Sequence, residues 1–146
     1  MRYYEDIEVD SIQDLGSYTV PKSEMIEFAE RYDPQPIHVD EDVARETIHE
    51  GLIASGWYTA SVCMRLLVDG FLAGTASVGA FGLDELRWRT PVRAEDRIRA
   101  EHRILEATKS TTRDDRGYVT GELTAHNQND EEVIEWRATS IFLRRP

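Results

Sequence analysis

The stretch Gly51-Leu52-Ile53-Ala54-Ser55-Gly56-Trp57 opens an apolar segment that runs on to Val68, where Asp69-Gly70 supplies a stop signal. Apolar residues lie on all sides of a helical wheel drawn for this segment, and Arg65 is its only charge. A helix that is apolar all round is a buried one. The segment therefore predicts one long helix at the centre of the fold.

The residues before this helix predict an edge strand and two further helices. The β-prone run Tyr18-Thr19-Val20 predicts the edge strand, which Pro21 ends. An amphipathic helix is expected from Lys22 to Tyr32, ended by Pro34, because four apolar residues recur there with helical spacing. Asp40 is a good N-cap for a short helix that ends at about Glu46.

After about Thr75 the hydrophobic pattern changes to a period of two residues, which is typical of half-buried strands. Hairpin-type turn clusters stand at 114–117 and 127–130. The period-two pattern, the two turn clusters and the stretch Val78 to Arg89 together predict about four long antiparallel strands. One buried helix and a wide antiparallel meander indicate a single curved sheet wrapped around that helix. We therefore expect one α+β domain over residues 1–146.

The composition excludes several classes of protein. The chain has 146 residues, 40% of them hydrophobic and 31% charged, and a formal net charge of -11. Nucleic-acid and anionic-membrane binders need a basic face, so neither partner is expected. No apolar run is long enough to cross a membrane, and the start lacks the apolar core of a signal peptide. A cytoplasmic location is therefore predicted.

Metal and thiol chemistry are not expected. Cys63 is the only cysteine and lies in the apolar segment, where a small buried thiol is a better interpretation than a nucleophile. His49, His102 and His126 lack the spacing of metal ligands. No glycine cluster stands between a strand and a helix as a phosphate loop requires.

Arginine dominates the basic residues, because only two of the seventeen are lysine. An acidic, arginine-rich chain is compatible with a salt-rich cytoplasm, where surface carboxylates keep a protein hydrated. Under that hypothesis the protein unfolds as salt is withdrawn, and full stability at low ionic strength counts against it.

The stretch Tyr32-Asp33-Pro34-Gln35-Pro36-Ile37-His38 is the strongest chemical signal in the chain. Asp33 and His38 place a carboxylate and an imidazole five residues apart, on a segment that two prolines stiffen. Such a pair is suited to acid-base catalysis. The simpler alternative is that Asp33 caps the end of a helix and that His38 is a solvated loop residue.

These motifs resemble the MaoC-like hydratases, relatives of the R-specific enoyl-CoA hydratases that have the hot-dog fold. The resemblance rests on residues 32–40, on 51–57 and on Arg89-Thr90-Pro91-Val92-Arg93, and it covers nearly the whole chain. The acidic, arginine-rich character is similar to that of versions from halophilic archaea. The resemblance implies a hot-dog fold, in which a curved antiparallel sheet wraps one central helix.

The resemblance also implies a reaction and its residues. The hydratase pattern matches Asp33 and His38 and implies syn addition of water to a trans-2-enoyl thioester, or dehydration of an (R)-3-hydroxyacyl thioester. The family's Ala-His-Gly is matched by Ala54-Ser55-Gly56, with serine in place of histidine. The Gly56 amide is expected to donate to the thioester oxygen. The family's serine two helical turns on is replaced by Met64.

Further substrate contacts are predicted at Pro36, Ser55, Trp57, Arg89 and Arg93. Trp57 would form core or a wall of the acyl pocket. Arg89 and Arg93 lie in an arginine-rich region, and arginine suits the phosphates of coenzyme A. The alternative for this region is a solvated face whose arginines pair with Glu85, Glu95 and Glu101.

The predicted protein is thus a hydro-lyase. A homodimer is expected because an open sheet can pair at its edges, and an oligomer of dimers is a further alternative. The acyl-CoA substrate brings coenzyme A as its carrier, and no separate cofactor is expected. A hot-dog thioesterase is the competing enzyme, although it would normally need a carboxylate on the central helix. A non-catalytic acyl-thioester-binding subunit is the third alternative, and the presence of both Asp33 and His38 argues against it.

Overall fold

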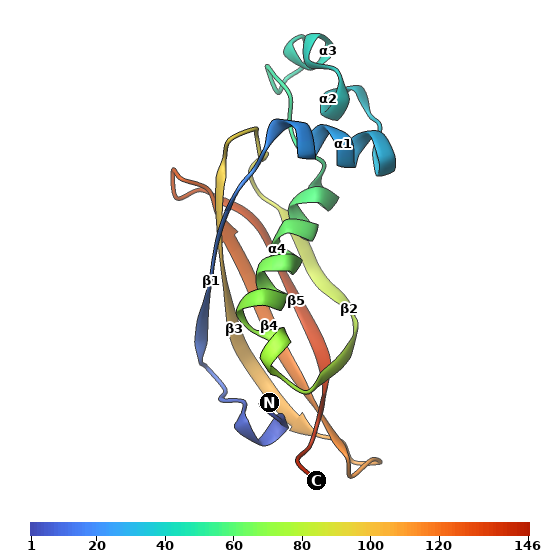
Figure 1. Cartoon of the computed structure of the whole chain (residues 1–146), viewed down its shortest axis with the longest axis vertical. Helices are drawn as coiled ribbons and strands as arrows, with labels where there is room; N and C mark the ends of the chain where they lie inside the picture. Colours follow the sequence, from blue (N-terminus) through green and yellow to red (C-terminus); the bar gives the residue numbers. More distant parts are fainter.

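A single antiparallel sheet of five strands, in the order β1-β3-β4-β5-β2, forms the body of the protein. The computed structural model describes residues 1–146, and α4 lies across one face of the curved sheet (Figure 1). The strands are β1 (Ile12–Thr19), β2 (Ser77–Trp88), β3 (Arg97–Lys109), β4 (Arg116–His126) and β5 (Glu132–Leu143). The helices are α1 (Lys22–Tyr32), α2 (Pro36–Val39), α3 (Glu41–Arg45) and α4 (Gly56–Gly70), with 3-10 turns η1 (Tyr4–Asp6) and η2 (Leu72–Gly74). This is the predicted α+β hot-dog fold.

The sheet combines a local meander with two edge strands that come from earlier in the chain. Strands β3, β4 and β5 follow one another as antiparallel neighbours. Strand β1 pairs with β3 at one edge, and β2 pairs with β5 at the other. The edge strand predicted around Tyr18 is therefore confirmed, and it is longer than the β-prone run indicated.

Helix α4 confirms the predicted central helix. Its buried residues meet the inner face of the sheet in one hydrophobic core. The expectation that this helix is buried on all sides is wrong for the single chain, because Trp57 and Met64 expose 55% and 44% of their surface. The physical reason is that the sheet covers only one side of α4.

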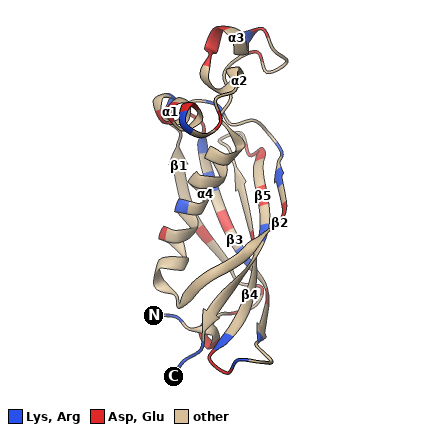
Figure 2. Cartoon of the chain, turned by 90° about the vertical axis from the view of Figure 1, so that its right-hand side faces the viewer, with Lys and Arg blue, Asp and Glu red and all other residues tan.

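Strand β3 alternates between buried and exposed residues as its sequence predicts. On β3 the side chains of Ile98, Ala100 and His102 are buried, while Arg99 and Glu101 between them are exposed. Figure 2 shows charged residues on the strands and on the end helices, whereas α4 is almost free of them. No helix of the protein is long and apolar enough to span a membrane.

Three short helices gather beyond the N-terminal end of α4, at the end of the sheet away from the chain termini (Figure 1). The predicted helix α1 has the expected bounds. The side chain of Asp40 caps α3 by accepting hydrogen bonds from the backbone N–H groups of Asp42 and Val43. Helix α2 was not predicted, because a four-residue helix leaves no periodic pattern.

His102 packs directly against a neighbouring strand. An ideal Cβ placed on Gly121 of β4 would lie 2.1 Å from His102 Nε2, so only glycine admits the imidazole there. The ring is also 4.9 Å from that of Phe71, and its Nδ1 atom has no hydrogen-bond partner. Burial of this ring lowers the pKa of His102 from 6.5 to about 4.

This low pKa predicts a pH-dependent stability. Below pH 6.5 the unfolded chain binds a proton that the folded state does not take up until about pH 4, so the free energy of unfolding decreases as the pH falls through this window. The decrease due to His102 between pH 7 and pH 5 should be about 2 kcal/mol. Denaturant unfolding at both pH values measures it.

The His102→Leu variant should lose this part of the pH dependence while keeping any part that carboxyl groups cause. A wild-type protein and a His102→Leu variant with the same pH dependence would contradict the account.

Candidate active site

The fold brings Asp33 and His38 together. His38 Nε2 lies 3.3 Å from Asp33 Oδ2, and the two side chains expose only 7% and 19% of their surface. Pro34 lies just beyond the end of α1, leaving Asp33 as the C-cap, and Pro36 occupies the first position of α2, which carries His38. The short connection from Asp33 to Pro36 thus joins α1 to α2 so that the side chains of Asp33 and His38 face each other.

The imidazole of His38 is held by the backbone in front of α4. Its Nδ1 atom lies 2.9 Å from the carbonyl oxygen of Ile53. Because a carbonyl oxygen can only accept, Nδ1 carries the proton of this hydrogen bond. The other ring nitrogen, Nε2, faces Asp33 Oδ2 and is the atom through which the imidazole can exchange a proton.

Both carboxylate oxygens of Asp33 accept hydrogen bonds from side chains. Gln35 Nε2 donates to Oδ1 at 2.7 Å, and Ser55 Oγ donates to Oδ2 at 2.7 Å. The hydrogen bond from Gln35, followed by that from Ser55, lowers the pKa of Asp33 below 3.8. Asp33 is therefore an ionised, oriented carboxylate at neutral pH.

The start of α4 leaves one backbone donor free. Ser55 is the N-cap and accepts from the N–H of Trp57 at 3.3 Å, whereas the N–H of Gly56 makes no hydrogen bond within the chain. Trp88 covers Gly56 from the side: its Nε1–H donates to the Gly56 carbonyl at 2.9 Å, and an added Cβ would lie 2.4 Å from Trp88 Cε2. Glycine is therefore required here by the close approach of an indole ring.

These groups surround a cavity of about 450 Å³ between the end helices, the start of α4 and the end of β2. Five of the residues singled out from the sequence line it: Asp33, His38, Gly56, Trp57 and Arg89. Pro36, Ser55 and Arg93 do not. Pro36 begins α2, and Ser55 is fully buried beneath Asp33.

The predicted arginine region is largely engaged by the protein itself. Arg89 forms an ion pair with Glu135 while it lines the cavity. Arg93 donates from Nη2 to the carbonyl oxygen of His49 at 2.6 Å, so it holds the loop before α4. Arg103 pairs with Asp10 on the outer face of β3. Most of these arginines are therefore engaged by the protein itself, although none of them pairs with Glu85, Glu95 or Glu101, the partners expected from the sequence.

Among the other cavity residues, Gln35, Thr59 and Trp88 were not found by sequence reasoning. Gln35 could have been, because it stands between the prolines of the motif. Thr59 is buried one turn beyond Ser55 on α4 and lines the cavity. Trp88 contacts Trp57 edge to face, with ring centroids 5.2 Å apart, and nothing local in the sequence indicates that contact.

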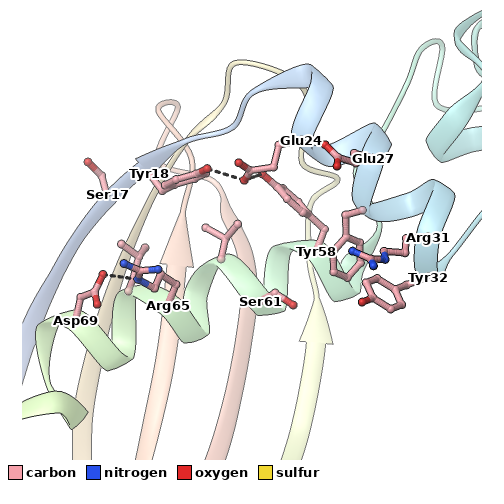
Figure 3. A pocket seen from close by; sticks show the side chains of 13 residues that line it. Ser17, Tyr18, Glu24, Glu27, Arg31, Tyr32, Tyr58, Ser61, Arg65 and Asp69 are labelled. Carbon is pink, nitrogen blue, oxygen red and sulfur yellow. Dashed lines mark hydrogen bonds and ion pairs between the residues drawn. The ribbon is translucent and has the colours of Figure 1, made fainter.

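A larger cavity of about 750 Å³ lies on the other flank of α4, between that helix, α1 and β1 (Figure 3). Glu24 Oε1 accepts hydrogen bonds from the hydroxyl groups of Tyr18 and Tyr58 there, at 2.5 and 2.7 Å. The hydrogen bond to Glu24 raises the pKa of Tyr18, and burial raises that of Tyr58, so neither phenol is a base at neutral pH. This cavity holds no imidazole, and size alone does not make it the reactive site.

Comparison with known proteins identifies the same family as the motifs. The family model for the MaoC like domain matches residues 8–127. The uncharacterized protein YdeM of Bacillus subtilis (strain 168) is 28% identical over 129 residues, which cover 88% of this chain and 89% of that protein.

Solved structures agree with this match. The MaoC-like dehydratase from Rhodospirillum rubrum is 37% identical, with a TM-score of 0.92 over 100% of this chain and 99% of that one. The (R)-hydratase from A. caviae involved in PHA biosynthesis is 25% identical, with a TM-score of 0.76 over 97% of this chain and 99% of that one. A family model that matches most of the chain, and a related dehydratase along its whole length, show that this chain belongs to the MaoC-like family.

Proposed function

We propose that the protein is an enoyl-CoA hydratase that adds water reversibly to a trans-2-enoyl thioester to give the (R)-3-hydroxyacyl thioester. The observation that carries this proposal is the contact of Asp33 Oδ2 with His38 Nε2, 3.3 Å apart at the wall of a cavity that Gly56 also lines. An acid-base pair and an oxyanion donor are the groups that this reaction requires.

The hydrogen bonds around the pair favour a division of roles. Asp33 has both oxygens occupied by donors and a lowered pKa, so it is a weak base that orients water. His38 binds the Ile53 carbonyl through Nδ1, which leaves Nε2 as the ring atom that faces Asp33 and can exchange a proton with water. We assign to His38 the removal of a proton from water and to Asp33 the stabilisation of the imidazolium that results.

The reaction balances without a further reactant. The hydroxide part of the water forms the new bond to Cβ while its proton passes to His38 Nε2. The electrons of the alkene move toward the thioester carbonyl, and the Gly56 N–H, at the positive end of α4, donates to the oxygen where charge develops. His38 then returns the proton to Cα on the same face, which gives syn addition.

The test is incubation of the protein with crotonyl-CoA, following loss of the enoyl absorbance together with release of free thiol. Asp33→Asn should lower kcat/KM at least about 100-fold, because an amide cannot stabilise the imidazolium as a carboxylate does. The matched control is Asp69→Asn, which removes an exposed carboxylate paired with Arg65 in the larger cavity. It should keep the wild-type rate.

The outcomes of this assay separate the candidate functions. Hydration without thiol release supports the hydratase, whereas thiol release would identify a thioesterase. An Asp33→Asn variant of unchanged stability and full rate would refute the mechanism. Absence of both reactions across acyl lengths would favour a non-catalytic acyl-thioester-binding subunit.

Arg89 is the residue that we propose for the phosphates of the coenzyme A carrier. It is the one arginine of the predicted pair that lines the cavity, and it is half exposed. Arg89→Ala should raise KM for crotonyl-CoA about tenfold while changing KM for a truncated crotonyl thioester much less.

Arg93→Ala is the matched control, because Arg93 donates to the His49 carbonyl and does not line the cavity. It should leave the ratio of the two KM values unchanged. An equal change in KM for both thioesters in the Arg89→Ala variant would contradict the proposed contact of Arg89 with coenzyme A.

A homodimer that forms through the β2 edge is also proposed. Strand β2 buries no residue in the single chain, and Val78, Phe81 and Leu83 expose 58%, 69% and 46% of their surface. Open edges with exposed apolar side chains favour pairing with a second copy.

Phe81→Glu should therefore shift the protein toward monomer in sedimentation velocity. Ile12→Glu changes an apolar residue that exposes 60% of its surface on the opposite edge strand β1, and it should not shift the protein toward monomer. A wild-type protein that is monomeric at micromolar concentration would contradict this proposal.

A further inference from the structure

The residue beneath the candidate catalytic pair differs from the pattern that the motifs resemble, because serine stands at position 55 where that pattern has histidine. Ser55 is fully buried and does not line the cavity. Its hydroxyl cannot contact a substrate directly without a rearrangement, so its role must be exerted through its neighbours.

Two hydrogen bonds in series pass through this hydroxyl. The backbone N–H of Trp57 donates to Ser55 Oγ at 3.3 Å, and Ser55 Oγ–H donates to Asp33 Oδ2 at 2.7 Å. Accepting the first bond polarises the hydroxyl and strengthens the second. The series begins at the N-terminus of a 15-residue helix, where the helix dipole favours nearby negative charge.

The oxygen that Ser55 holds is the one that faces the imidazole. Oδ2 of Asp33 lies 3.3 Å from His38 Nε2, while Oδ1 is held by Gln35 from the exposed loop. Only Ser55 therefore fixes the reactive oxygen from within the core. Gln35 is exposed to solvent, whereas Ser55 is fully buried as the N-cap of α4.

We infer that Ser55 is a positioning residue, which couples the start of α4 to Asp33 and holds Oδ2 against His38 as an ionised acceptor. The role in hydration rests on the proposed function, but the coupling itself does not. Because of this coupling, the proton affinity of Asp33 depends on the Ser55 hydroxyl, although Ser55 does not line the cavity.

The titration of Asp33, followed by the NMR signal of its carboxyl carbon in the full-length protein, tests this inference. Ser55→Ala should raise the proton affinity of Asp33 about tenfold, because one hydrogen bond to the carboxylate is lost. The KM for crotonyl-CoA should stay close to the wild-type value while kcat decreases.

Ser61→Ala is the matched control. It also removes a serine hydroxyl from α4, but that hydroxyl donates to the Trp57 carbonyl at 2.8 Å and lies away from Asp33. Ser61→Ala should leave the titration of Asp33 unchanged. A purely structural Ser55 would lower the stability of the Ser55→Ala variant without moving the Asp33 titration, and that result would overturn the inference.

The wild-type protein gives a second readout if Ser55→Ala does not fold. The amide proton of Trp57 should titrate with the pKa of Asp33, because it donates into the series that ends at Oδ2. A Trp57 amide that does not respond to this titration would also overturn the inference. If the wild-type protein hydrates no thioester while both NMR results hold, the proposed function fails and the coupling stands.

Discussion

The backbone of Ile53 and Ala54 is the constraint on which the candidate site depends. The N–H of Ile53 donates to the Ile37 carbonyl at 3.1 Å, and its carbonyl accepts from His38 at 2.9 Å. The N–H of Ala54 donates to the Val92 carbonyl at 2.8 Å. Two residues thereby join the end helices, the loop before β3 and the start of α4. Because these bonds are satisfied within the core, the site is built before any ligand enters it.

This anchoring explains how a strongly acidic protein can keep a defined acid-base pair. Asp33 is not stabilised by a permanent cation, since its donors are the neutral side chains of Gln35 and Ser55. An imidazole beside such a carboxylate can remain neutral and still gain stabilisation when it becomes protonated. The imidazole of His38 can therefore take up a proton and release it again, as reversible hydration requires.

Much of the fold follows from local patterns in the sequence. The apolar run up to Val68 and the alternating residues of β3 each predict an element that the structure confirms, because helix and strand periods are properties of the chain itself. The position of β2 at the far edge does not follow, since strand pairing across the sheet depends on contacts distant in sequence. The half-exposed state of Trp57 and Met64 was missed for the same reason.

In the candidate site, too, local sequence patterns indicated some features, whereas contacts between distant residues were not predictable. Asp33, His38 and Gly56 were indicated by type and spacing, and the structure places all three around one cavity. The contact of Ser55 with Asp33 and that of Trp88 with Gly56 join residues 22 and 32 positions apart, so no local pattern reveals them. Clustering of the arginines in sequence left a phosphate site and a paired face as alternatives, and it could not reveal that most of them contact the protein's own acceptors.

The central claim is that one pair, Asp33 and His38, adds both parts of water to the same face of an enoyl thioester. The stereochemistry of the product formed from crotonyl-CoA in D2O tests this claim most directly. The account predicts (R)-3-hydroxybutyryl-CoA with a single deuterium at C2, placed by syn addition. The (S) product, or deuterium distributed over both positions at C2, would contradict it.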